Sequence, residues 1–162
     1  MTPSKDCYSF IQEFEGYSET AYQDSVKVWT IGYGTIRYPN GIAVKEGDVC
    51  TKEEAEVYLE HEINAKAKGV DTAIKQTPLN QGQYDALVSF TYNLGIGALQ
   101  SSTLLKKLLK NPHDSTIYAY QTENNKPIPD TCEFVKWVRA GGQILNGLLR
   151  RRAAEADMYG GK

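Results

Sequence analysis

Apolar and polar residues follow two different periods along this chain, and the change of period divides it into segments. Residues 4–15 have apolar side chains at a helical spacing, and Gly16 ends the pattern. From Tyr17 to Gly47 β-forming residues and turn residues, among them Asp24 and Ser25, replace it. The sequence therefore predicts an N-terminal helix that ends at Glu15, followed by a small antiparallel sheet of about three short strands.

A second helix is predicted from about residue 52 to residue 76. Thr51 and Glu54 have the spacing of a capping box, in which a hydroxyl and a carboxylate bind free amides at a helix start. The apolar positions behind them keep helical phase up to Pro78. Because the pattern exceeds the roughly 8 to 20 residues usual for a globular helix, we expect this helix to connect two lobes.

The rest of the chain is predicted to be helical, with loops at Pro112 and at 124–129. Asn80 opens one helix, and the others are expected over 102–110, 130–139 and 143–159. The fold class is therefore α+β, a single domain over 1–162. It has a sheet lobe at about 17–50, a linking helix, and a larger helical lobe at about 80–162 that includes helix 4–15. A cleft is expected between the lobes.

Composition narrows the possible functions. The 162 residues are 41% hydrophobic and 23% charged, with a net charge of −2, which is typical of a globular protein and predicts no nucleic-acid partner. Cys7, Cys50 and Cys132 are too few and too scattered for a disulfide framework or a zinc site, so we expect buried, catalytically silent thiols. His61 lacks a second metal ligand four residues later. No metal, cofactor, signal peptide or membrane association is predicted.

Two carboxylates and a hydroxyl lie close together in the sequence around the predicted sheet: Glu15, Asp24 and Thr30. Glycoside hydrolysis needs one protonated carboxyl group as acid and one carboxylate as base or nucleophile. The C-terminal end of a helix disfavours negative charge, so we expect a raised pKa for Glu15. Asp24 is expected to be solvated in a polar turn. This assigns Glu15 as the acid and Asp24 as the base, although the spacing alone is a weak signal.

The residues around this trio give it more weight. The segments Glu15-Gly16-Tyr17, 22–24 and 28–35 resemble the opening of the phage-type lysozyme (endolysin) family, glycoside hydrolase family 24. The family pattern is Glu, eight residues, Asp, five residues, Thr, and this chain matches each position. The similarity continues through 90–95, 101–105, 137–142 and 147–155, so it covers nearly the whole chain.

The resemblance implies a lysozyme-like fold and hydrolysis of the β-1,4 bond between N-acetylmuramic acid and N-acetylglucosamine in a peptidoglycan strand. It also implies a monomer without cofactor that waits in the host cytoplasm, reaches the wall after release by a separate holin, and lyses the cell. A branch of the family with a hydrophobic secretory anchor and a regulatory thiol fits less well, because no such segment precedes Cys7. The family's sugar contacts correspond to Ile36, Tyr92, Asn93 and Ser102.

Other interpretations stay open at the level of sequence. A lytic transglycosylase would cleave the same bond without water, although Asp24 with Thr30 favours hydrolysis. A wall-binding module would have lost the chemistry. The basic run 150–152 is interpreted as a solvated helix end, with a guanidinium beside Glu15 as the alternative.

Overall fold

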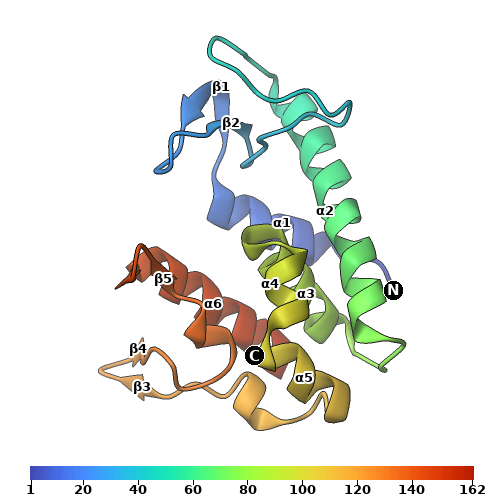
Figure 1. Ribbon diagram of the computed structural model, residues 1–162, viewed down its shortest axis with the longest axis vertical. Coiled ribbons are helices and arrows are strands. Elements are labelled where there is room, and N and C mark those ends of the chain that lie inside the picture. Colours follow the sequence, from blue (N-terminus) through green and yellow to red (C-terminus); the bar gives the residue numbers. More distant parts are fainter. The chain divides into compact units, whose positions relative to one another are not determined.

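The computed structural model describes residues 1–162 and confirms an α+β chain with six α-helices and short antiparallel strand pairs (Figure 1). Its contacts form two compact units. One unit is Lys5–Ala65, and the other combines Met1–Ser4 with Lys66–Lys162. The first helix is thus grouped with the sheet, whereas the sequence assigned it to the helical lobe. No helix is long and apolar enough to cross a membrane.

Helix α1 (Lys5–Glu15) begins the sheet-containing unit and ends where the sequence predicts. Its apolar stripe is anchored by Cys7 and Ile11, which are fully buried. Gly16 has a φ of +68° and its N–H binds the Gln12 carbonyl at 3.0 Å, a helix ending that a side chain would strain. Glu15 is therefore held at the last helical position.

The sheet has two strands, β1 (Ser18–Gln23) and β2 (Trp29–Gly32), in antiparallel register with Tyr22 opposite Thr30. The predicted third strand is wrong. Residues 33–50 contribute only the isolated bridges Thr20↔Val49, Ile31↔Thr35 and Arg37↔Ala43. The reason is local: this segment contains Pro39 and three glycines with positive φ, which interrupt a regular hydrogen-bond ladder.

Helix α2 (Lys52–Ile74) starts at the predicted capping box. The Thr51 N–H binds Glu54 Oε1 at 3.0 Å, and the Glu54 N–H binds Thr51 Oγ1 at 3.1 Å. The buried positions recur every three or four residues: Ala55, Leu59, Ile63, Ala67, Val70, Ala73 and Ile74. The helix contributes its first part to one unit and its last part to the other.

The second unit is built on helix α3 (Gln81–Leu94), which packs against α6 (Asn146–Gly160). Asn80 and Gln83 cap α3 reciprocally, as the sequence indicates. A Cβ atom added to Gly82 would lie 2.6 Å from the Met158 carbonyl oxygen, so the glycine permits the close approach of the two helices. Along the chain, α3 is followed by two short helices, α4 (Ile96–Ser101) and α5 (Thr103–Lys110).

The connection from α5 to α6 differs from the prediction. It consists of the 3₁₀ turns η1 (Ser115–Ile117) and η2 (Phe134–Lys136) and the hairpins β3–β4 (Thr122–Glu123 with Lys126–Pro127) and β5–β6 (Arg139–Ala140 with Gln143–Ile144). The expected helix 130–139 is therefore wrong, and the last helix starts at Asn146 instead of 143. Asp130 has a φ of +65°, which a helix does not allow, and Gly141 and Gly142, also with positive φ, form the turn of the hairpin that takes up Gln143 and Ile144.

The basic run in α6 also differs from the prediction. Arg150 is exposed, but Arg151 and Arg152 are 4% and 0% exposed, so a solvated helix end is wrong for both. Both guanidinium groups approach Glu155, which is fully buried: Arg152 Nε lies 2.7 Å from Glu155 Oε1, and Arg151 Nε lies 3.4 Å from Oε2. Ser89 on α3 also donates a hydrogen bond to Glu155. The ion pairs lie within α6, and the hydrogen bonds of Ser89 with Glu155 and Arg151 connect α6 with α3.

Candidate active site

Glu15 presents its carboxyl group to the loop that follows β2. A Cβ atom added to Gly34 would lie 3.1 Å from Glu15 Oε1 and 3.2 Å from its Cδ. Gly34 also has a φ of +83°, a conformation that side chains rarely adopt. The half-buried carboxyl group of Glu15 is thus in close contact with backbone that only glycine can supply.

Asp24 closes the turn between β1 and β2. Its Oδ1 accepts hydrogen bonds from the N–H groups of Val26 and Val28, each at 2.9 Å. The Asp24 N–H in turn binds the Val28 carbonyl at 3.0 Å. Because both side-chain bonds involve Oδ1, Oδ2 is left for another partner while the carboxylate is held in one orientation.

Thr30 lies on β2 and is 4% exposed. Its hydroxyl donates to the Val28 carbonyl at 3.0 Å, so the oxygen can still accept a hydrogen bond. The backbone of Val28 therefore binds Asp24 through its N–H and Thr30 through its carbonyl. The structure brings these two predicted residues together on one fixed turn.

Tyr22 connects this turn with Glu15. Burial, followed by the negative charges of Glu15 and Asp24, raises the pKa of the Tyr22 phenol. Both carboxylates are therefore close enough to act on one hydroxyl group. The sequence prediction missed Tyr22 and Gly34. The alternation of side chains that places Tyr22 two residues before Asp24 is the signal that points to the tyrosine, but the contact between Gly34 and Glu15 has no local signature.

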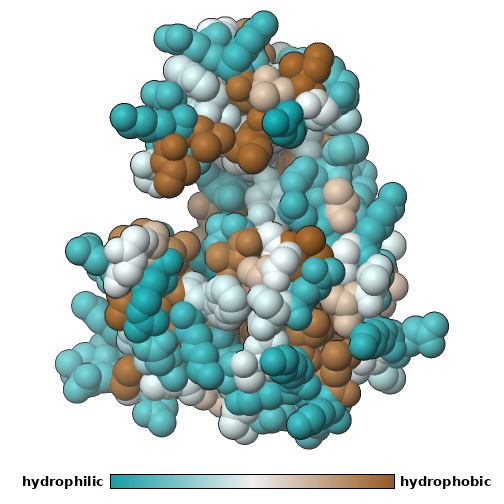
Figure 2. Space-filling view, in the orientation of Figure 1, coloured by the Kyte–Doolittle hydropathy of each residue, from teal (hydrophilic) through white to brown (hydrophobic).

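The predicted sugar contacts fall in both units. In the sheet-containing unit Ile36 is 50% exposed. Figure 2 shows apolar side chains gathered on the surface over β1, β2 and the loops after them. The exposed large apolar residues of this unit are Tyr17, Tyr22, Val26, Val28, Ile36, Ile42, Val49 and Val57. Ile36 is the predicted sugar contact on this surface, and its exposure leaves it accessible to a ligand.

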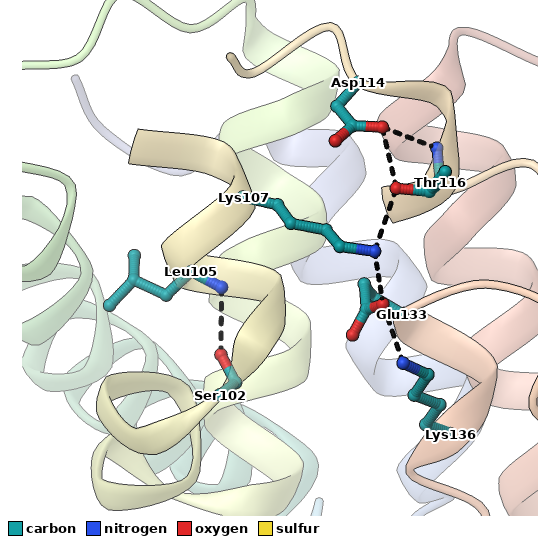
Figure 3. A network of polar contacts seen from close by, with 7 residues as sticks. All are labelled: Ser102, Leu105, Lys107, Asp114, Thr116, Glu133 and Lys136. Carbon is teal, nitrogen blue, oxygen red and sulfur yellow. Dashed lines mark hydrogen bonds and ion pairs between the residues drawn. The ribbon is translucent and has the colours of Figure 1, made fainter. Parts of the chain in front are cut away.

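The other three predicted contacts lie in the helical unit. Tyr92 and Asn93 are half-buried at the end of α3, and Asn93 Oδ1 is buried without a hydrogen-bond partner. Ser102 is 2% exposed and caps α5 (Figure 3): its hydroxyl accepts from the Leu105 N–H at 3.0 Å and donates to the Leu99 carbonyl at 2.7 Å. These bonds give Ser102 a helix-capping role, and its sugar contact stays a prediction.

Comparison with known proteins shows the family of this chain. The family model described as phage lysozyme matches residues 12–155. The chain belongs to the phage lysozyme family. The match includes Glu15, Asp24 and Thr30 and extends over most of both units.

Phage lysozyme relatives include the endolysin of Bacillus phage B103, which is 37% identical over 98% of this chain. The chain spans about half of that relative, 54% of its length. The endolysin of Acyrthosiphon pisum secondary endosymbiont phage 1 is 36% identical over 92% of this chain and 91% of its own length. Among solved structures, the endolysin from Escherichia coli O157:H7 phage FAHEc1 matches with a TM-score of 0.75 and 36% identity, covering 98% of this chain and 93% of that one.

Proposed function

We propose that this chain is a lysozyme that hydrolyses the β-1,4 bond between N-acetylmuramic acid and N-acetylglucosamine in peptidoglycan, and so lyses bacterial cells. The observation that carries the proposal is the Val28 turn, which holds a carboxylate and a hydroxyl acceptor side by side near a second carboxyl group. Family membership and the endolysin relatives support the same activity.

Glu15 acts as the general acid that protonates the leaving oxygen. Asp24 Oδ2 accepts a proton from the attacking water, and Thr30 Oγ1 accepts that water's second hydrogen bond. Because the Thr30 proton is committed to the Val28 carbonyl, the hydroxyl presents a lone pair to the water in a fixed direction. This arrangement gives the water one lone pair for attack on the anomeric carbon.

The first test replaces the acid. Glu15→Gln preserves shape and removes the proton, so the rate of release of reducing ends from purified peptidoglycan should fall by at least about 10²- to 10⁴-fold. Glu13→Gln, on the exposed side of the same helix, is the matched control and should keep wild-type activity. Mass spectrometry of the new ends separates the alternatives: reducing ends support hydrolysis, anhydro ends a lytic transglycosylase, and no new ends a wall-binding module.

Attack by water predicts inversion at the anomeric carbon. Direct attack by Asp24 would need no water-binding hydroxyl and would retain the configuration through a glycosyl ester. We therefore expect proton NMR of the first product from a β-linked glycan to show the α-anomer before mutarotation. Initial β-anomer, or an ester trapped on Asp24, would make Asp24 the nucleophile.

The proposal extends to how the enzyme is used. We propose that it works as a monomer, is held in the host cytoplasm and reaches the periplasm when a holin opens the membrane, as the family resemblance implies. Production of the chain alone should then leave cells intact until the inner membrane is permeabilised. Lysis without permeabilisation would contradict holin dependence and leave the hydrolytic proposal untouched.

A further inference from the structure

Tyr22 differs from four other tyrosines of the sheet-containing unit in what its hydroxyl contacts. Tyr8, Tyr17, Tyr38 and Tyr58 each donate a hydrogen bond within the protein, to Asn64, the Cys50 carbonyl, Asp48 and Glu54 respectively. The Tyr22 hydroxyl has no such bond, and its side chain is 42% exposed. It is therefore available to a bound molecule.

The sheet register directs Tyr22 to the catalytic side. Tyr22 lies directly opposite Thr30 in the antiparallel pair, and directly opposed side chains project from the same face of a sheet. Asp24 follows Tyr22 by two residues, after Gln23 at the end of β1. Glu15 and Asp24 both act electrostatically on its phenol. A hydroxyl near both the acid and the base is near the sugar ring on which they work.

The phenol is also in the protonated form that donates. Its pKa is raised by burial and by the two carboxylates, so it remains an O–H group at neutral pH. A donor aimed at the ring oxygen would oppose the positive charge that develops there in the transition state. An exocyclic oxygen, of a hydroxyl or an N-acetyl group, does not develop this positive charge, so it is a better hydrogen-bond acceptor for Tyr22 than the ring oxygen.

We infer that Tyr22 binds substrate: its hydroxyl donates a hydrogen bond to an exocyclic oxygen of the sugar between Glu15 and Asp24, and its ring packs on that sugar. The inference rests on the proposed glycosidase function. Tyr17 provides a matched comparison, because it is 40% exposed in the same unit and its pKa is raised by burial and then by Cys50 and other groups, without a contribution from Glu15 or Asp24.

The test measures binding without turnover. In a Glu15→Gln background, calorimetric titration with N-acetylglucosamine tetramer should give a dissociation constant about 3- to 10-fold higher when Tyr22→Phe is added, because one neutral hydrogen bond is lost. Adding Tyr17→Phe should leave the constant unchanged. With Glu15 intact, Tyr22→Phe should lower kcat/KM on peptidoglycan by about tenfold, at an unchanged melting temperature.

Binding and turnover of Tyr22→Phe at the level of the parent protein would overturn the inference. Equal losses in Tyr22→Phe and Tyr17→Phe would overturn it as well, since the effect would then come from the unit in general. These results leave the proposed function intact as long as Glu15→Gln is inactive. Full activity of Glu15→Gln would instead remove the proposed function itself.

Discussion

At the scale of single residues, the contact between Gly34 and Glu15 shows how the backbone approaches the proposed acid. A Cβ atom at position 34 would be in tight contact with the carboxyl group, about 3.1 Å from Oε1. The two residues are 19 positions apart in the sequence. The sequence could therefore single out Glu15, Asp24 and Thr30 as candidates through their spacing and family resemblance, but not the glycine in contact with the proposed acid.

Gly34→Ala should reduce kcat by up to about tenfold, because the added Cβ would push the Glu15 carboxyl group aside by a few tenths of an ångström and a displacement of about 1 Å can cost 10²-fold. The substitution also strains the backbone, because alanine at positive φ costs about 1 to 2 kcal/mol of stability. Gly41→Ala isolates this strain: it has a φ of +87° and nothing within 4 Å of the added atom. We expect similar melting temperatures for the two variants and near-wild-type kcat only for Gly41→Ala. Equal kcat values would show that Gly34 does not position Glu15.

At the scale of elements, explicit end signals made the structure predictable. Helix α2 begins directly after Thr51, whose side chain caps it, and α1 ends at Glu15, directly before Gly16. The expected helix 130–139 failed because Phe134 and Val138, spaced like a helical stripe, are buried around a short 3₁₀ turn and a hairpin. Periodicity reports which residues are buried, and tertiary contacts decide the backbone that buries them.

Glu133 shows how this irregular segment is held in place. Its Oε2 accepts from Lys107 Nζ at 2.7 Å and from Lys136 Nζ at 2.8 Å, and Lys107 also donates to Thr116 (Figure 3). Burial opposes the charge of Glu133, but the two lysines outweigh it and lower the pKa of the carboxyl group. The network connects α5 with η1 and η2.

Glu133→Gln should lower the free energy of unfolding at pH 7 by about 1 to 2 kcal/mol. This is the contribution expected of a hydrogen bond to a charged group, lowered because both lysines are partly exposed to solvent. A carboxyl with a lowered folded pKa stabilises above its unfolded value, so this difference should shrink as the pH falls below about 4.5. Urea unfolding at pH 7 and pH 3 measures both effects. Glu123→Gln, an exposed control, should change stability by less than about 0.5 kcal/mol. A pH-independent loss in Glu133→Gln would rule out the charge as its cause.

At the scale of the whole molecule, the buried cysteines offer a probe of each unit. Cys50 is 7% exposed in the unit Lys5–Ala65, and Cys132 is 3% exposed in the other unit. Burial raises the pKa of both thiols, which further limits their reactivity in the folded protein. Each thiol should therefore react only after its own unit opens.

We expect the two units to unfold together, because α2 runs without interruption from one into the other and helix formation is cooperative. Variants that keep only Cys50 or only Cys132, with alanine at the other two positions, should react with a thiol reagent over the same range of urea concentration. Both should also keep the specific activity of the parent, since no thiol takes part in the proposed chemistry. Reaction of Cys50 at clearly lower urea would mean that the sheet-containing unit opens by itself. In that case the catalytic turn around Val28 would have a lower local stability than the helical unit, and activity would be lost before the helical signal in the same titration.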